Sequence, residues 1–327
     1  MISVHSRIMY RLFVITSILS LQGCSSVGHS AFFKEYERGY REKIAFKTHY
    51  VQQNGWKIHV REYGEEHKNV APSLVMMHGF PDSMHLYDRL VPLLANDRHI
   101  ITFDFIGWGD SDKPEQYHYD VASQRQNLEA VISYFKLKRI VPVLHDASGQ
   151  PGIDWALDNP EKTAGLVLLN TYYSPMPTLK APEAIARFST PGFYRDVSVW
   201  ATRNFDYLWI RGYNKQMAKF IRTKALREPF QKLLGYQSLQ IRPAFYALNR
   251  TLSEELEKRR ANIKRLKAFQ PTVTIIFGND DPYLNSGVAK EFHRLFPHSE
   301  LHLIENAGHF VQIDAPERVA FFISSAG

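Results

Sequence analysis

The order of apolar and polar residues predicts a β-hairpin followed by strands that alternate with helices. Residues 45–51 and 56–63 alternate in polarity on either side of Asn54-Gly55, a pair that favours a tight hairpin turn. Further apolar runs predict strands over 73–77, 99–103, 139–144, 165–169, 272–277 and 300–304, with helices over 121–135 and 149–157. This alternation is typical of a mostly parallel sheet flanked by helices.

The segment between the strands that end at 169 and begin at 272 lacks this alternation. It is rich in Phe, Tyr, Trp and basic residues, and any single aromatic residue in it is explained most simply by core packing. With 327 residues, of which 44% are hydrophobic and 22% charged, the chain is long enough for one large α/β domain with an inserted subdomain.

The net charge of +7 raises the question of an anionic partner. The basic residues are scattered, and their densest cluster, within 258–267, lies on a helical stretch that is also rich in Glu. A solvated helix face explains this cluster best, so we expect no nucleic-acid partner.

The N-terminus has the pattern of an export signal. Arg7 and Arg11 precede an apolar stretch, 12–21, that is too short to span a bilayer. It ends in Leu21-Gln-Gly-Cys24, which resembles a bacterial lipobox, and Cys24 is the only cysteine. We predict a signal peptide over 1–23, lipidation of Cys24 as a membrane anchor, and a tether over 24–43. By the same resemblance Ser25 favours the outer membrane, facing the periplasm; the alternative for Cys24 is an ordinary buried cysteine.

Chemically useful side chains follow three of the predicted strands. The strand over 139–144 runs into His145-Asp146 and then into small residues that open a helix. An aspartate in this place is either a helix N-cap or a nucleophile. Asp281 follows the strand over 272–277, and His309 follows the strand over 300–304.

Two glycine-containing loops accompany these residues. His78-Gly79-Phe80-Pro81 follows the strand over 73–77, and a Gly-x-Gly turn, 104–114, follows the next strand. The second loop has the wrong glycine spacing for a phosphate-binding loop, so we interpret its glycines as turn residues.

In this order the five motifs resemble those of the α/β-hydrolase superfamily, in particular its Asp-nucleophile branch of epoxide hydrolases and haloalkane dehalogenases, over roughly residues 44–325. The resemblance implies an α/β-hydrolase fold in which Asp146 is the nucleophile and His309 is the base, oriented by Asp281. It also implies an oxyanion hole made by the backbone N–H groups of Phe80 and Ala147, with no metal and no cofactor.

The same resemblance divides the chain into a first core part over 44–171, a helical cap over 172–268 and a second core part over 269–327. A cap excludes water and favours a small apolar electrophile as substrate. The sequence departs from the family at Ala147-Ser148-Gly149, where many members have Trp-Gly-Gly, and at the bulky Leu144.

Which leaving group the site can accept depends on the hydrogen-bond donors that surround it. A halide needs N–H donors, and the family's usual positions hold Ala147 and Phe80, so Trp200 or Trp209 of the cap would have to substitute. An epoxide needs a phenol, for which Tyr207 and Tyr246 are candidates in contexts loosely like the family's tyrosine segments. We therefore expect an epoxide hydrolase, with a haloalkane dehalogenase as the alternative.

Two interpretations from other classes stay open. Ser148 is the nucleophile of a carboxylesterase in the first, although Asp146 and Gln150 flank it where glycine is expected. The second is a binding protein that keeps the fold without catalysis, which the retained triad residues disfavour.

Overall fold

The computed structural model describes residues 31–235 and 237–325, which divide into two units between Ile44 and Ala45. In the first unit residues 31–43 form a helix, which lies within the predicted tether. The predicted signal peptide and Cys24 lie outside the described residues. In the described part of the chain, no helix has the length and apolar character needed to cross a membrane.

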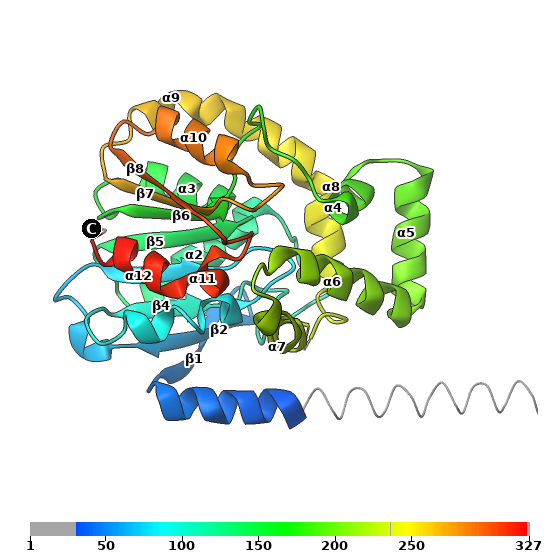
Figure 1. Cartoon of the computed structure of the whole chain (residues 1–327), viewed down its shortest axis with the longest axis horizontal. Coiled ribbons are helices and arrows are strands. Elements are labelled where there is room, and N and C mark those ends of the chain that lie inside the picture. Colours follow the sequence, from blue (N-terminus) through cyan, green and yellow to red (C-terminus); the bar gives the residue numbers. More distant parts are fainter. Residues whose placement is uncertain (1–30, 236, 326–327) are drawn as a thin grey trace, which may run out of the picture. The chain divides into compact units, whose positions relative to one another are not determined.

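The second unit is built on one eight-stranded sheet with the order β1-β2-β4-β3-β5-β6-β7-β8 (Figure 1). The two strands of the hairpin are antiparallel, β2 is antiparallel to β4, and all later pairs are parallel. This confirms the predicted fold class. The strands are β1 (Lys47–Gln53), β2 (Trp56–Tyr63), β3 (Ser73–Met77), β4 (Ile100–Phe103), β5 (Ile140–Asp146), β6 (Leu166–Thr171), β7 (Val273–Gly278) and β8 (Ser299–Ile304).

Helices flank the sheet and also form a separate group beyond its carboxyl edge. Between β6 and β7 the chain forms α4 to α9, and Figure 1 shows that α4 to α7 gather at one end of the unit, with α5 outermost. The helices are α2 (Val121–Tyr134), α3 (Gly149–Asp158), α4 (Glu183–Ser189), α5 (Phe193–Asn204), α6 (Asp206–Phe220), α7 (Lys224–Leu234), α8 (Arg242–Lys258), α9 (Ile263–Lys267), α10 (Ser286–Leu295), α11 (Val311–Asp314) and α12 (Pro316–Ser324).

The central strands explain why the sequence shows continuous apolar runs there. Every residue of β3, β4, β6 and β7 is buried, because helices cover both faces of a parallel sheet. The hairpin turn also has the predicted geometry: Asn54 and Gly55 both have positive φ, +50° and +87°. The buried strands form a rigid base whose carboxyl ends carry the candidate site.

Candidate active site

The predicted nucleophile turn forms at the end of β5. Asp146 is the last residue of that strand, and its φ is +49°, in the left-handed region that a residue with a Cβ enters only with strain. The neighbouring backbone comes so close that a Cβ added to Gly79 would lie 2.5 Å from the Asp146 Cβ. A side chain at position 79 would therefore displace the carboxylate.

Packing beside the turn accommodates the two departures from the family pattern. Leu144 is fully buried against Gly152, where an added Cβ would lie 2.3 Å from the leucine Cδ2. Ser148 is also fully buried, and its hydroxyl lies 2.9 Å from the carbonyl oxygen of Met77 and 2.8 Å from that of His145. The Ser148 hydroxyl thus holds the turn to β3 and is not part of the cavity wall.

Two backbone N–H groups face the Asp146 carboxylate. The N–H of Phe80 donates to Asp146 Oδ2 at 3.2 Å, and the N–H of Ala147 also bonds to this carboxylate. The loop that carries Phe80 is fixed by the buried His78, whose Nδ1 donates a hydrogen bond to the carbonyl oxygen of Gly79 at 2.6 Å. The structure thus brings both predicted oxyanion donors to the predicted nucleophile.

His309 and Asp281 are joined by a hydrogen bond of 2.8 Å between Nδ1 and Oδ2. Asp281 accepts further hydrogen bonds from Asn170 Nδ2 at 3.0 Å and from the N–H of Tyr283 at 2.9 Å. The His145 ring bonds through Nε2 to the carbonyl oxygen of His309 at 3.0 Å, which holds the backbone of His309 to the turn at the end of β5. Sequence analysis did not single out Asn170, although its place near the carboxyl end of β6, between β5 and β7, was a usable signal.

The surroundings of Asp146 and His309 shift the pKa of both side chains. Burial lowers the pKa of His309, but the charge and hydrogen bond of Asp281, together with the charge of Asp146, raise it to about 9. Burial raises the pKa of Asp146, while the charge of His309 and the two backbone N–H groups oppose this. Loss of the charge on Asp146 would therefore lower the pKa of His309.

Asp82 is a further carboxyl group at this site. Its side chain is buried, and its Oδ1 has no hydrogen-bond partner in the described part of the chain. Burial and the charge of Asp146 raise its pKa to about 8, so near neutral pH it is mostly protonated and can donate a hydrogen bond. Sequence analysis missed Asp82, and the only signal was its place directly after Pro81 in the loop that carries Phe80.

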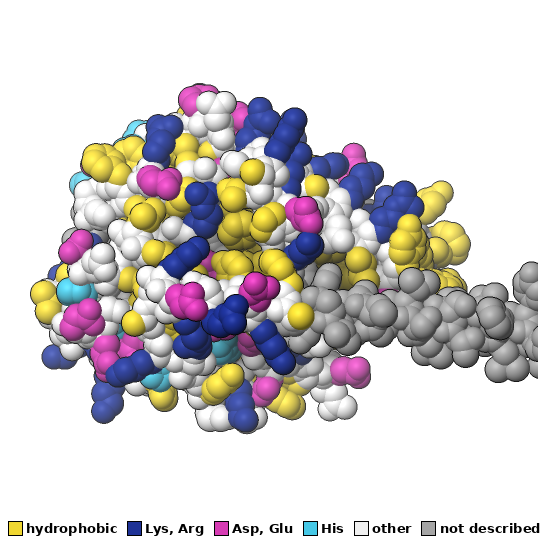
Figure 2. All heavy atoms as spheres, turned by 60° about the horizontal axis from the view of Figure 1, so that its bottom comes forward, with side chains coloured by type: hydrophobic (Ala, Val, Ile, Leu, Met, Phe, Trp, Pro, Cys, Tyr) yellow, Lys and Arg dark blue, Asp and Glu magenta, His cyan; other side chains and the backbone are white. Residues whose placement is uncertain are grey.

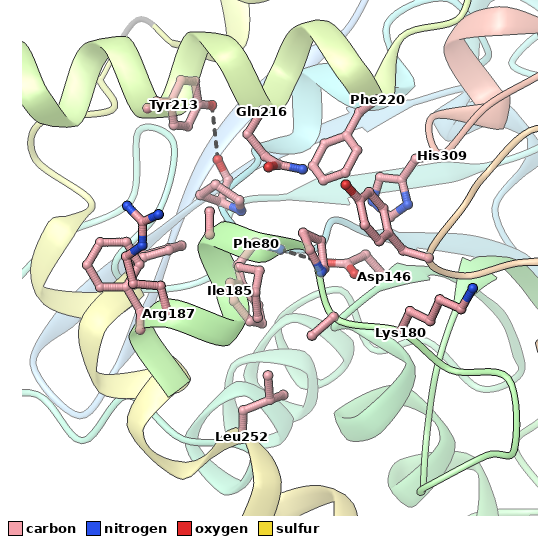
Figure 3. Close-up of a pocket in the computed structure, with 18 of the residues that line it drawn as sticks. Phe80, Asp146, Lys180, Ile185, Arg187, Tyr213, Gln216, Phe220, Leu252 and His309 are labelled. Carbon is pink, nitrogen blue, oxygen red and sulfur yellow. Dashed lines mark hydrogen bonds between the residues drawn. The ribbon is translucent and has the colours of Figure 1, made fainter. Parts of the chain in front are cut away.

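A cavity of about 330 Å³ lies between the sheet edge and the cap, with Phe80, Asp146 and His309 in its wall. Its other walls are mainly apolar side chains of α4, α6 and α8. Figure 3 shows Gln216 and Phe220 of α6 pointing toward Asp146 and His309. The arrangement places a carboxylate and an imidazole in the wall of a mainly apolar pocket.

The two tyrosines predicted as proton donors lie elsewhere. The Tyr207 side chain is 68% exposed and does not line the cavity. Tyr246 is buried but lines a second cavity, and its hydroxyl bonds to Thr202 Oγ1 at 2.8 Å. We correct the expectation for both: Tyr207, at the start of α6, is turned to solvent, and Tyr246, on α8, faces the second cavity instead of the one that contains Asp146.

The other predicted donors and ligands can be placed as well. Trp209 lines the cavity, whereas Trp200 is 59% exposed on the outer cap. Within residues 31–235 and 237–325, no group of three or more His, Cys, Asp or Glu side chains has the arrangement needed to hold a metal ion.

Comparison with known proteins agrees with the geometry. Residues 72–316 match the family model described as alpha/beta hydrolase fold. A cis-3-alkyl-4-alkyloxetan-2-one decarboxylase of Shewanella oneidensis is 28% identical over 84% of this chain and 86% of its own length.

Two solved structures share the fold at low sequence identity. A membrane phospholipase A, described as a bacterial virulence factor, aligns with a TM-score of 0.72 at 20% identity over 96% of this chain and 97% of its own. The haloalkane dehalogenase DatA of Agrobacterium tumefaciens C58 aligns with a TM-score of 0.71 at 20% identity, over 86% of this chain and 96% of its own. The chain belongs to the α/β-hydrolase family and is a hydrolase.

Proposed function

We propose that this hydrolase uses the Asp146 carboxylate to attack a carbon atom of a small apolar electrophile, forming an alkyl ester with the enzyme. Water activated by His309 then attacks the carbonyl carbon of this ester and releases the product. The position of Asp146 in the cavity wall, with the Phe80 N–H directed at it, supports this role.

The charges of Asp146 and His309 suit a reaction in which alkylation of Asp146 comes before hydrolysis of the ester. Alkylation removes the negative charge of Asp146, which lowers the pKa of His309 and yields the neutral imidazole that can accept a proton from water. The Phe80 and Ala147 N–H groups are then in place for the oxyanion that forms when water adds to the ester. His309 is thus converted to a base by the first step.

The surroundings of Ser148 argue against the esterase alternative. Its hydroxyl is fully buried and bonded to backbone carbonyl oxygens, outside the cavity that holds Asp146 and His309. A nucleophile has to reach its substrate, and the site's base has to reach the nucleophile. An aspartate mechanism therefore accounts for the site better than a serine mechanism.

The observation that carries the leaving-group proposal is a pair of N–H donors on α6. Trp209 and Gln216 both line the cavity, and Trp209 Nε1 and Gln216 Nε2 are buried without a hydrogen-bond partner in the described part of the chain. An N–H group of this kind stabilises an anion but does not give up its proton at neutral pH. This favours a substrate whose leaving group is stable as an anion.

Two electrophile classes meet this requirement. A haloalkane releases a halide, whereas attack on the alkyl carbon of an oxetan-2-one breaks the ring C–O bond and leaves a carboxylate within the alkyl-enzyme. The names of two similar proteins, the DatA haloalkane dehalogenase and the Shewanella oxetan-2-one decarboxylase, point to the same two classes. We place these classes ahead of epoxides for this chain.

One observation keeps the epoxide as a second candidate. Tyr172 lines the cavity near Asp146, and burial together with the charge of Asp146 raises its pKa well above the usual value. Its phenol therefore stays protonated and suits proton donation to an opening ring. Tyr213 is less suited, because its hydroxyl already lies between the carbonyl oxygens of Pro81 at 3.1 Å and Leu234 at 2.9 Å.

Substitution of the N–H donors tests the leaving group. Trp209→Phe and Gln216→Met each leave an apolar side chain at the position and remove the N–H group. We expect each to slow alkylation of Asp146 by a bromoalkane or an alkyl oxetan-2-one on the order of 10²-fold, because one donor to the developing anion is lost. Single-turnover kinetics measures this step.

The control is Trp56→Phe, the same substitution at an exposed tryptophan of β2, which should leave alkylation unchanged. An alkyl epoxide completes the substrate panel. If only the epoxide alkylates Asp146 and Tyr172→Phe slows that step while Trp209→Phe does not, the leaving-group proposal is wrong.

A further inference from the structure

The outer part of the cap carries an unusual concentration of exposed apolar side chains. Of thirteen large hydrophobic residues exposed in the described part of the chain, seven fall within 193–208. No residue of α5 is buried. We call this region the cap surface; its apolar members are Phe193, Tyr194, Val197, Trp200, Phe205, Tyr207 and Leu208. A contiguous surface of this kind marks a binding site more often than scattered exposed residues do.

Basic side chains accompany the aromatic ones. A cavity of about 370 Å³ on the same face is lined by Arg195, Arg203 and Arg250 together with Trp200 and Tyr246. The Arg203 guanidinium lies 5.2 Å from the centre of the Tyr246 ring. Arg195 pairs with the neighbouring aspartate, whereas neither Arg203 nor Arg250 has a carboxylate partner in the described part of the chain. Figure 2 shows basic and hydrophobic side chains together at the end of the molecule where α5 lies in Figure 1.

We propose that the cap surface binds the surface of an anionic phospholipid bilayer. Trp, Tyr and Phe side chains favour the headgroup level of a membrane, and arginines beside them contact lipid phosphates. A second copy of the chain is a poorer occupant, because a two-fold contact through this surface would bring the unpaired arginines of both copies into one interface. Aromatic residues and unpaired arginines on one face therefore fit a lipid surface best.

The cap surface is continuous with the site cavity. Leu208 is 43% exposed on this surface and also lines the cavity that contains Asp146, and Thr202 of α5 lines that cavity too. A molecule bound through the cap surface would take up apolar substrate directly from the bilayer. This last step rests on the proposed function, whereas membrane binding itself does not.

Tryptophan fluorescence of the full chain tests the contact. The probe is a vesicle of phosphatidylglycerol and phosphatidylcholine in which the phosphatidylcholine carries bromine on its acyl chains, because bromine quenches a tryptophan that it touches. We expect Trp200→Phe to remove most of the lipid-dependent quenching and Trp56→Phe to leave it, since both residues are exposed but only Trp200 lies on the cap surface. Replacing phosphatidylglycerol by phosphatidylcholine, or Arg203 and Arg250 by glutamine, should reduce the quenching severalfold.

Quenching that is equal in wild type and Trp200→Phe would overturn the proposal. So would light scattering that shows a dimer, dissociated by Trp200→Ser, together with no quenching by the vesicles. The Asp146→Asn variant should be quenched like the wild type, so a failure of the chemistry and a failure of membrane binding are distinguishable.

Discussion

Asp146→Asn should lower turnover by roughly 10⁴ to 10⁶-fold and leave the fold intact. An amide is a poor nucleophile toward carbon, so the enzyme ester cannot form. Asparagine has the shape of aspartate and tolerates a positive φ, so it suits the +49° backbone, and its carbonyl oxygen can still accept the Phe80 N–H. Single-turnover kinetics and mass spectrometry of the peptide that contains residue 146 measure the effect.

The matched control is Ser148→Ala, two residues further along the same turn. It removes a buried hydroxyl that bonds to two carbonyl oxygens, so it should cost about 1–2 kcal/mol in the free energy of unfolding while alkylation of Asp146 persists. An active Asp146→Asn enzyme paired with an inactive Ser148→Ala enzyme would refute the aspartate mechanism and restore the esterase hypothesis.

His309→Gln should separate the two chemical steps. Alkylation of Asp146 does not need the imidazole, but hydrolysis of the ester does, and loss of a general base typically costs roughly 10² to 10⁴-fold. The alkyl-enzyme should therefore accumulate, and intact-mass spectrometry should show the added alkyl group on Asp146. The exposed His118 offers a control, since His118→Gln should leave no such adduct after turnover. Failure of the adduct to build up with any substrate in the panel would argue against a covalent ester.

The rate of ester hydrolysis should rise with pH and then level off below pH 9. Only the neutral imidazole accepts a proton, and alkylation removes the charge on Asp146 that helps to raise the pKa of His309 to about 9. Asp281→Asn removes both a charge and a charge-assisted hydrogen bond, so the rise should shift to lower pH. Single-turnover rates across the neutral range check this; an identical profile in Asp281→Asn would show that another group titrates.

The sequence predicted the site best where a reactive side chain comes directly after a buried strand. The apolar runs that end near Asp146 and Asp281 defined central strands, and parallel pairing brings the carboxyl ends of such strands to one edge. The fold class and the approach of Asp146, Asp281 and His309 were predictable for this reason. Asp82 was missed because its importance comes from burial beside a charge, which no local pattern in the sequence expresses. Asn170 was missed although its place near the carboxyl end of β6 was a usable signal.

The cap was much less predictable. Tyr207 and Tyr246 were selected from their local sequence, but the direction of a helical side chain depends on how the helix packs. In α6 the face that carries Trp209, Gln216 and Phe220 turns to the cavity, at helical spacing, while Tyr207 points to solvent. Lipidation of Cys24 falls outside the described residues and stays a prediction.

Because the backbone at Asp146 is left-handed, the residue that would be most stable at this position is not the residue that the proposed activity needs. Glycine adopts a φ of +49° without the Cβ penalty, so Asp146→Gly relieves strain in the turn and also removes a buried carboxylate. A laboratory screen that selects only for heat resistance would therefore favour chains that have lost the proposed nucleophile. Thermostable variants of this enzyme have to be selected with an activity assay at every round.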